Sequence, residues 1–407
     1  MTMLDDYRNV TGTYEIPETS RAWNLYGAGL ENLRLEAAPV PEPAEDQLLV
    51  RIDAVGICAS DWKMISQGER HARMQGRNLA AEPTVPGHEV SMTVVRVGEA
   101  LEGRYHVGER YAVQAEIYID GENVAYGYKL RGADQQVQTI GPEIYEGGYL
   151  LPVDPALGYS QAALAEPWAC VYHAYSHHRE SRSVLPGGTA WYVGAGPLGL
   201  MHIEKGIQDG AGRILVTEMK PDRLQKVRSS LEPLARDKGA DLVVVDLASD
   251  AVENHLDPRG ADDIIILAPV AKAAEAALPY LAKNGYLNMF AGFPDRDKAW
   301  MRINLNDMHY GQWTLVATSG SPIEALRQAL DDAAAGRINP NNAVACVGGI
   351  ETVQEAIHHN HEGTYPGRIV VYPQIEMPLT PLEDLTDDGR WTKEAEERLL
   401  AERLGEG

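Results

Sequence analysis

The sequence predicts a two-domain α/β protein that combines a barrel-like β domain with a doubly wound parallel-sheet domain. Its 407 residues exceed the roughly 250 to 300 residues at which single cores stop growing, so two domains are expected. From about Trp23 to Val153, short β segments such as QLLVRIDAVGI and VSMTVVRVG are cut by Gly and Pro. From Thr189 onward, apolar strands alternate with helices, which is typical of a parallel sheet covered on both faces.

The middle of the chain supplies the strands and helices of that sheet in regular order. After the helical stretch GYSQAALAEPWACVYHAYSHH, the expected strands are TAWYVG, RILVTEM, DLVVVD, DDIIILAP, YLNMFAG and TLVATSG. The expected helices between them are GLMHIEKGIQDG, PDRLQKVRSSLEPLARDKG and VAKAAEAALPYLAKNG. Right-handed crossovers join such units.

The last part of the chain holds too few elements for a third domain. It reads as a helix, IEALRQALDDAAAG, a strand around Ala343 to Val347, a helix, ETVQEAIHH, and a closing strand, RIVVYP. We expect these to return to the first domain. The predicted domains are therefore 1–180 completed by 322–407, and 181–321.

The amino-acid composition limits which partners and which cellular compartment we expect for this protein. Lys and Arg number 36 and Asp and Glu 59, which gives a net charge of −23 and disfavours nucleic acid and anionic membranes as partners. Three scattered cysteines are too few for a disulfide framework, which favours the reducing cytoplasm. The N-terminal MTMLDDYRNVTG has no basic or apolar run, and no window approaches the roughly 18 apolar residues of a membrane span.

Two polar features are expected to be solvated. The acidic tail beyond Pro378 contains RWTKEAEERLLAERL, which predicts an amphipathic helix that is solvated or docks a subunit. Five histidines lie in polar stretches without evident ligand partners and are expected at solvated helix ends: His177, His178, His358, His359 and His361.

The turn VGAGPLG predicts a dinucleotide site. It follows a predicted strand, opens a helix, and precedes a second strand that ends in Glu218, nineteen residues after Gly199. The expected cofactor-binding residues are Gly194, Gly196, Pro197, Leu198, Gly199, Glu218 and Arg223. A carboxylate at the ribose favours NAD. NADP remains possible because Lys220 and Arg223 are close to Glu218 in sequence.

A candidate metal site lies in the first domain. Cys58 precedes His88 by 30 residues, Glu89 follows at once, and Glu166 appears far downstream. A thiolate, an imidazole and a carboxylate with an open fourth position suit catalytic Zn²⁺. Spacing alone leaves open that these are unrelated core residues.

The motifs GICASD, PGHE, LAEP and VGAGPLG, in this order, resemble the zinc-dependent medium-chain dehydrogenase/reductase superfamily from about Ala22 to Pro373. LAEPWAC, NGYLNMFAG, NLNDMHYGQWTLVATSGS and NPNNAVACVGG are similar to its polyol dehydrogenase and sorbose-1-phosphate reductase branch. The resemblance implies a GroES-like catalytic domain, a Rossmann cofactor domain, one catalytic zinc, and a homodimer or homotetramer.

The resemblance also implies roles for single residues. Cys58, His88 and Glu166 would bind zinc, and Glu89 would bind it directly or alternate with water. Glu166 is preferred because the third cysteine of ethanol-type enzymes falls on Ala169. Asp61 would orient His88. Ser60 stands where the family keeps the hydroxyl that relays the substrate proton.

Two departures from the family matter. The lobe that often holds a structural zinc, matched to 111–148, contains no cysteine, so no structural zinc is expected. Lys63 replaces a common relay histidine, and could relay a proton, attract an anionic substrate, or be an ordinary solvated lysine. Arg70, His71 and Arg73 follow it and could line the mouth of the site.

The implied function is hydride transfer between NAD(P) and a secondary alcohol of a polyol or sugar, free or phosphorylated. An amino-alcohol dehydrogenase of the threonine type is the alternative substrate class. A zinc-free quinone reductase, or a non-catalytic relative such as a lens structural protein, is the alternative protein class. Neither of these would need Cys58, His88 and Glu166 together.

Overall fold

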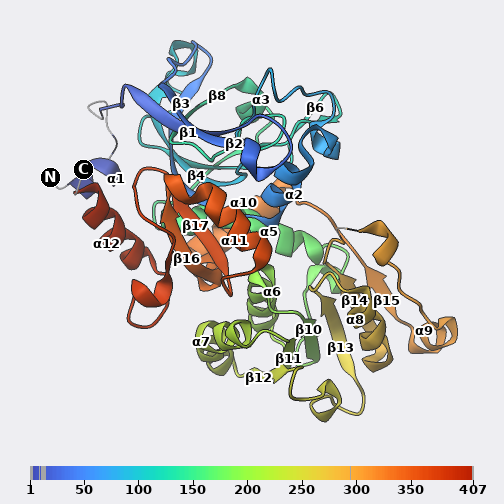
Figure 1. The fold of residues 1–407 in the computed structure, drawn as a ribbon. Helices are drawn as coiled ribbons and strands as arrows, with labels where there is room; N and C mark the ends of the chain where they lie inside the picture. Colours follow the sequence, from blue (N-terminus) through green and yellow to red (C-terminus); the bar gives the residue numbers. More distant parts are fainter. Residues whose placement is uncertain (1–2, 9, 11–14, 294, 406–407) are drawn as a thin grey trace. The chain divides into compact units, whose positions relative to one another are not determined.

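The computed structural model describes residues 3–8, 10, 15–293 and 295–405 (Figure 1). Its contacts divide the chain into two compact units: Met1–Pro167 with Pro322–Gly407, and Trp168–Ser321. These units differ from the predicted domains over 168–180, and the domain assignment stays a prediction. Part of the N-terminal stretch expected to lack a targeting segment lies outside the described residues.

The larger unit is built on an eight-stranded sheet. Its path runs β18, β16, β17, β3, β4, β5, β9, and β8 also pairs with β3. The strands are β3 Leu48–Gly56, β4 Glu89–Val97, β5 Arg110–Val113, β8 Val137–Ile140, β9 Leu150–Pro152, β16 Val344–Gly349, β17 Arg368–Tyr372 and β18 Thr380–Pro381. Every residue of β3 is buried, because this strand has neighbours on both edges and its side chains belong to two core clusters, one with Leu48, Val50, Ile52 and Val55 and the other with Leu49.

Smaller elements surround this sheet. Two hairpins are formed by β1 Thr19–Leu25 with β2 Leu33–Pro39, and by β6 Tyr118–Ile119 with β7 Glu122–Asn123. The helices are α1 Met3–Arg8, α2 Ala59–Gln67, α3 Pro142–Tyr145, α4 Tyr159–Ala163, α10 Ile323–Ala334, α11 Val353–Glu362 and α12 Lys393–Leu404, and α5 Ala165–Ala174 crosses from one unit into the other.

The C-terminal helix is not a purely solvated segment, which corrects one of the two expectations for the tail. Glu396 of α12 is 1% exposed. Its carboxylate accepts hydrogen bonds of 2.7 Å from the backbone N–H groups of Tyr159 and Ser160, at the start of α4. It also accepts one of 2.8 Å from the hydroxyl of Tyr372. A carboxylate placed here satisfies donors that the first turn of a helix leaves without partners.

The smaller unit is a doubly wound sheet. Its six parallel strands follow the order β12, β11, β10, β13, β14, β15, which is the order of dinucleotide-binding folds. They are β10 Thr189–Val193, β11 Arg213–Glu218, β12 Asp241–Asp246, β13 Ala261–Ile266, β14 Leu281–Met289 and β15 Thr314–Val316. The helices are α6 Pro197–Gln208, α7 Pro221–Lys238, α8 Ala271–Ala277 and α9 Leu305–Gly311.

One predicted helix of this unit is shorter than expected. The stretch VAKAAEAALPYLAKNG was expected to be helical throughout, but α8 ends at Ala277 and β14 begins at Leu281. Pro279 lies between them, and proline cannot supply the backbone N–H that a continuing helix needs. The residues LAKNG therefore open a strand.

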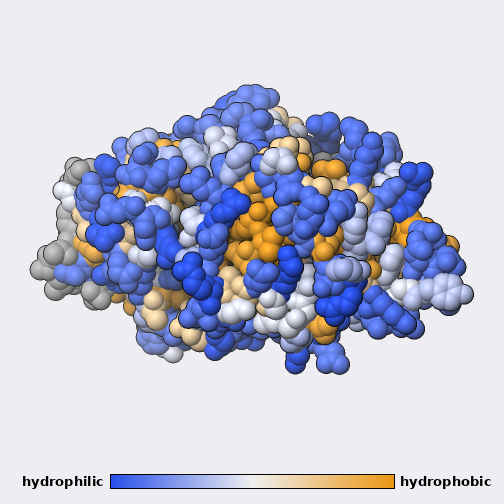
Figure 2. All heavy atoms as spheres, turned by 90° about the horizontal axis from the view of Figure 1, so that it is seen from below, coloured by the Kyte–Doolittle hydropathy of each residue, from blue (hydrophilic) through white to orange (hydrophobic). Residues whose placement is uncertain are grey.

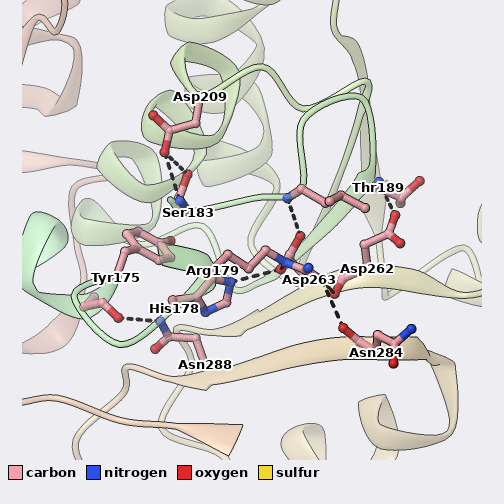
Figure 3. Close-up of polar contacts among 12 residues, drawn as sticks. Tyr175, His178, Arg179, Ser183, Thr189, Asp209, Asp262, Asp263, Asn284 and Asn288 are labelled. Atoms are coloured by element: carbon pink, nitrogen blue, oxygen red, sulfur yellow. Dashed lines mark hydrogen bonds and ion pairs between the residues drawn. The ribbon is translucent and has the colours of Figure 1, made fainter. Parts of the chain in front are cut away.

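His178 is buried in the smaller unit, contrary to the expectation of a solvated helix end. Its Nε2 lies 2.9 Å from Oδ1 of Asp263, and both side chains are 0% exposed (Figure 3). Arg179 pairs with the same carboxylate and donates to the backbone carbonyl of Asp262. The local sequence gives no sign of this contact, because Asp263 follows 85 residues later, on β13.

One face of the molecule is mostly polar (Figure 2). Figure 2 shows a face covered mostly by hydrophilic side chains, with apolar ones gathered in separate patches. No helix among the described residues is long and apolar enough to cross a membrane.

Candidate active site

Cys58, the first of the candidate metal ligands along the chain, lies just after the end of β3. Gly56 closes the strand, and Cys58 caps the N-terminus of α2 with extended backbone angles. The carboxylate of Asp61, one turn into the helix, accepts a hydrogen bond of 2.8 Å from the backbone N–H of Cys58. This reciprocal cap fixes the start of α2 and places the thiol at its first turn.

The pairing of β3 with β4 brings two further candidate ligands, His88 and Glu89, close to Cys58. Gly56 pairs with Glu89, the first residue of β4, and His88 directly precedes it. A Cβ at position 56 would lie 2.1 Å from Oε2 of Glu89, so only glycine lets this carboxylate lie over β3.

Cys58, His88 and Glu89 form the metal-ligand group that the described part of the chain contains. One ligand atom from each lies within 4.8 Å of the others. His88 is 5% exposed and Glu89 is 0% exposed, so water is largely excluded around them. A thiol, an imidazole and a carboxylate converging in this way form a donor set that fits Zn²⁺.

Asp61 links the thiol segment to the histidine, as the sequence analysis expects. Its Oδ1 lies 2.9 Å from Nδ1 of His88, and its side chain is 2% exposed. Burial lowers the pKa of His88, but the Asp61 carboxylate outweighs it, so that pKa lies well above its usual value. With Nδ1 directed to Asp61, Nε2 is the nitrogen left to bind a metal.

Glu166 is near this group but outside it. Its carboxylate is not among the ligand atoms that lie within 4.8 Å of one another. Glu166 is nonetheless close enough to interact with this group. Burial raises the pKa of Glu166 to about 7, and the charges of His88 and Glu89 also act on it. The structure thus places Glu89, rather than Glu166, beside Cys58 and His88.

Arg368 is the site residue that the sequence analysis missed. It pairs with Oε2 of Glu89, and both side chains are almost completely buried. The only sequence signal is an arginine at the start of the apolar run RIVVYP, where a buried charge needs a partner.

The two candidate relay residues differ in exposure. The hydroxyl of Ser60 is partly buried and lies 3.5 Å from the sulfur of Cys58. Lys63 is exposed on α2. Its charge contributes, after burial, to lowering the pKa of His71 to about 4.

The glycine-rich turn of the smaller unit has the form that the motif predicts. Gly194 follows β10 with a φ of 106°, a conformation that favours glycine, and Gly196 caps α6. Pro197 is the first residue of α6, where its missing N–H costs no hydrogen bond. Leu198 and Gly199 continue the helix, and Gly199 packs against the carbonyl of Gly194.

Glu218 ends β11 and closes onto this turn. Its carboxylate accepts hydrogen bonds of 3.0 Å from the backbone N–H of Ala195 and of 2.7 Å from that of Met219. Burial raises its pKa, but these N–H donors and Arg223 outweigh burial, so the pKa lies below its usual value. Arg223 lies 3.5 Å from the carboxylate, which places a cation beside the predicted ribose site.

Comparisons with known proteins identify relatives of this chain. The alcohol dehydrogenase GroES-like domain family matches residues 44–171. The uncharacterized protein YggP of Escherichia coli is 31% identical over 92% of this chain and 96% of its own. The L-sorbose 1-phosphate reductase of Klebsiella pneumoniae is 27% identical over 94% of this chain and 98% of its own.

The chain belongs to the zinc-dependent medium-chain dehydrogenase/reductase superfamily, in its polyol dehydrogenase branch. A solved structure of 2R,3R-butanediol dehydrogenase from Bacillus subtilis shares the fold, with a TM-score of 0.69 and 21% identity over 87% of this chain and 99% of that one. The predicted fold class, a GroES-like domain with a Rossmann domain, is therefore confirmed. This member of the superfamily is an oxidoreductase of the alcohol and polyol dehydrogenase type.

Proposed function

We propose that the enzyme transfers a hydride between NAD and a secondary alcohol of a polyol or sugar, free or phosphorylated, and reduces the ketose in reverse. The observation that carries this proposal is the convergence of Cys58, His88 and Glu89 within 4.8 Å, with Asp61 orienting the imidazole. The resemblance to the reductase of a sugar phosphate supports the substrate class.

We assign Cys58 and His88 as zinc ligands, with Glu166 in the third protein position when zinc is bound, although its carboxylate lies outside their group in this structure. Glu89, whose ligand atom already lies within 4.8 Å of theirs, would bind directly or alternate with water. Bound zinc would supply a Lewis acid that favours the alkoxide form of the substrate. Asp61 fixes the tautomer of His88 and increases its basicity. Arg368 pairs with one oxygen of Glu89, which would leave the other oxygen available to a bound metal.

The proton of the substrate hydroxyl would leave through Ser60. Its hydroxyl can accept one proton and donate another, and it lies beside the metal-site thiol. Lys63, exposed three residues further along α2, would pass the proton to solvent. Bound NAD would supply the hydride acceptor, and Glu218 would bind its adenosine ribose. NADP is a second candidate cofactor, because Arg223 lies beside Glu218 and could bind a 2′-phosphate.

A substrate screen tests this function. Zinc-loaded enzyme would be incubated with polyols, ketoses, their phosphates and amino alcohols, each with NAD(H) and NADP(H), and read at the nicotinamide absorbance band. We expect turnover of polyols or their phosphates. Turnover of amino alcohols alone would favour the threonine-type alternative, and no turnover of any alcohol would contradict the function.

We also propose that the enzyme is a homo-oligomer of the cytoplasm. Three large apolar side chains of the smaller unit are 77%, 75% and 70% exposed: Trp300, Leu305 and Tyr310. They lie on or near α9, and β15 at the sheet edge pairs only with β14 among the described strands. Exposed apolar groups beside a sheet edge favour association. The chain has only three cysteines, too few for a disulfide framework, which fits a reducing compartment.

A further inference from the structure

A tyrosine ring connects the metal centre to an arginine that the proposed mechanism does not use. Tyr128 is 2% exposed, and the ring of His88 lies 5.9 Å from its centre. The guanidinium carbon of Arg73 lies 5.1 Å from the centre of the same ring. Arg73 and the metal-site histidine therefore both lie close to the same buried ring.

Arg73 is held in place before any substrate arrives. Its guanidinium pairs with Glu116, whose side chain is 13% exposed. Glu116 is itself fixed, because Asn123 donates a hydrogen bond of 2.8 Å to its other oxygen. The backbone N–H of Arg73 also donates to Nδ1 of His71 at 3.2 Å. Holding a long side chain in one conformation reduces the entropy that a bound ligand would otherwise cost.

Arg73 faces a hollow of about 550 Å³ on the surface of the larger unit. The hollow is lined by Ala72, Arg73, Gln75, Gly76, Glu122, Asn123 and Lys129. Lys129 is 18% exposed and pairs with Glu122, which is 64% exposed. The guanidinium carries five N–H donors, more than Glu116 and the Tyr128 ring can accept. The hollow thus offers a fixed forked donor and a second cation to an anion.

The other basic residues of this segment are less suited to the task. Lys63 and Arg70 are exposed, where a charge is well solvated and contributes little to binding. His71 is buried, and burial together with Lys63 and Arg73 lowers its pKa to about 4. His71 is therefore neutral at pH 7 and adds no positive charge, although the sequence suggested it might.

We propose that Arg73, oriented by Glu116, is the specificity-determining residue that binds the phosphoryl group of the substrate in this hollow. The inference rests on the proposed function, because it takes the alcohol end of the same substrate to be at the zinc. A chain with a net charge of −23 repels anions at long range, so selection of a phosphate ester requires a local, pre-oriented cation. The planar fork of arginine matches the oxygens of a phosphate.

Kinetics with a matched pair of substrates test this assignment. The kcat/KM of zinc-loaded enzyme would be measured for a free hexitol and for its monophosphate, in wild type, Arg73→Gln, Arg73→Lys and Arg70→Gln. Arg73→Gln should lower kcat/KM for the phosphate about 10- to 100-fold, mainly through KM, and change that for the free hexitol less than threefold. The kcat/KM of Arg73→Lys for the phosphate should lie between those of wild type and Arg73→Gln, because lysine keeps the charge and lacks the forked guanidinium. Arg70→Gln, the same charge change on an exposed neighbour, should leave both substrates unchanged.

A binding measurement separates this proposal from the proposed function. Inorganic phosphate would be titrated against the melting temperature with NAD saturating, so that the dinucleotide site is already filled. Wild type and Arg70→Gln should be stabilised, and Arg73→Gln should lose most of the shift. Equal effects of Arg73→Gln on both substrates, or an unchanged phosphate shift, would overturn the role of Arg73 even if alcohols are oxidised. Absence of alcohol turnover with an Arg73-dependent phosphate shift would instead refute the function and keep the anion site.

Discussion

Arg368, the first residue of β17, forms a buried ion pair with Glu89, the first residue of β4. The contact exists because β17 and β4 pair with the two edges of β3. Within the described residues, the second oxygen of Glu89 has no hydrogen-bond partner. One carboxylate thus has one oxygen fixed by a cation and one oxygen available to the metal centre.

Removing Arg368 should destabilise the larger unit. Arg368→Leu leaves Glu89 as a buried, uncompensated charge, and loss of one partner of such a pair costs about 3 to 5 kcal/mol. Urea unfolding of the zinc-loaded protein measures the loss. Arg368→Leu/Glu89→Gln should recover part of it, because the unpaired charge is gone. A single variant as stable as wild type would contradict the prediction.

Metal analysis should find one zinc per chain. Cys58→Ser should lose both zinc and activity, because the thiolate is the softest of the proposed ligands. Cys170→Ser serves as the control, since Cys170 lies outside the ligand group, and it should keep its metal. Elemental analysis of the purified proteins measures this. Two tightly held zincs per chain, or full activity after stripping, would refute the single-site assignment.

Glu218 should set the choice between NAD and NADP. Glu218→Ser removes the carboxylate from the ribose 2′ position and frees Arg223 to approach a 2′-phosphate. NAD use should weaken and NADP use should improve, as read from kcat/KM with each cofactor. A wild type that already prefers NADPH tenfold, about 1.4 kcal/mol, would show that Glu218 has another role.

Acid should destabilise the smaller unit through His202. Burial, together with the charge of His178, lowers the pKa of His202 to about 3, while the unfolded chain has a pKa of about 6.5. Because the folded pKa is the lower one, the stability is fully present above pH 6.5 and is lost as pH falls toward 3. The loss reaches at most about 1.4 kcal/mol per pH unit.

Replacing His202 with asparagine should make the dependence on pH shallower over this window. Asparagine keeps an acceptor near the hydroxyl of Tyr175, which lies 2.6 Å from Nδ1 of His202, and it does not titrate. Chemical unfolding at several pH values from 4 to 7 gives the slopes. His177→Asn, at an exposed position, should match wild type. Parallel curves for all three proteins would show that His202 does not contribute.

Features that depend on adjacent residues could be predicted from the sequence. The turn at Gly194 and the strand ending in Glu218 follow from local patterns, and the structure has both. Contacts between distant segments could not be predicted. Asp263 reaches His178 because β13 pairs beside β10, and nothing near His178 indicates this partner.

In the candidate site too, residues in short motifs could be predicted and contacts between distant segments could not. Cys58, His88 and Glu89 are adjacent to short motifs, whereas Arg368 comes from a strand whose position depends on sheet order. The place of Glu166 relative to the ligand group depends on where α5 begins, which periodicity fixes only within a few residues. Sequence reasoning therefore named residues that converge in the structure and missed the counter-ion.

Arg368 follows Glu89 by 279 residues. During synthesis from the N-terminus, Cys58 and Glu89 leave the ribosome long before β17, and the whole of Trp168–Ser321 is made in between. Until β17 arrives, β3 lacks the neighbour that pairs with Val55 and Gly56, beside the thiol. The nascent protein must therefore carry Cys58 and Glu89 without Arg368 through most of translation, and the order of synthesis delays completion of the metal centre until almost the last step.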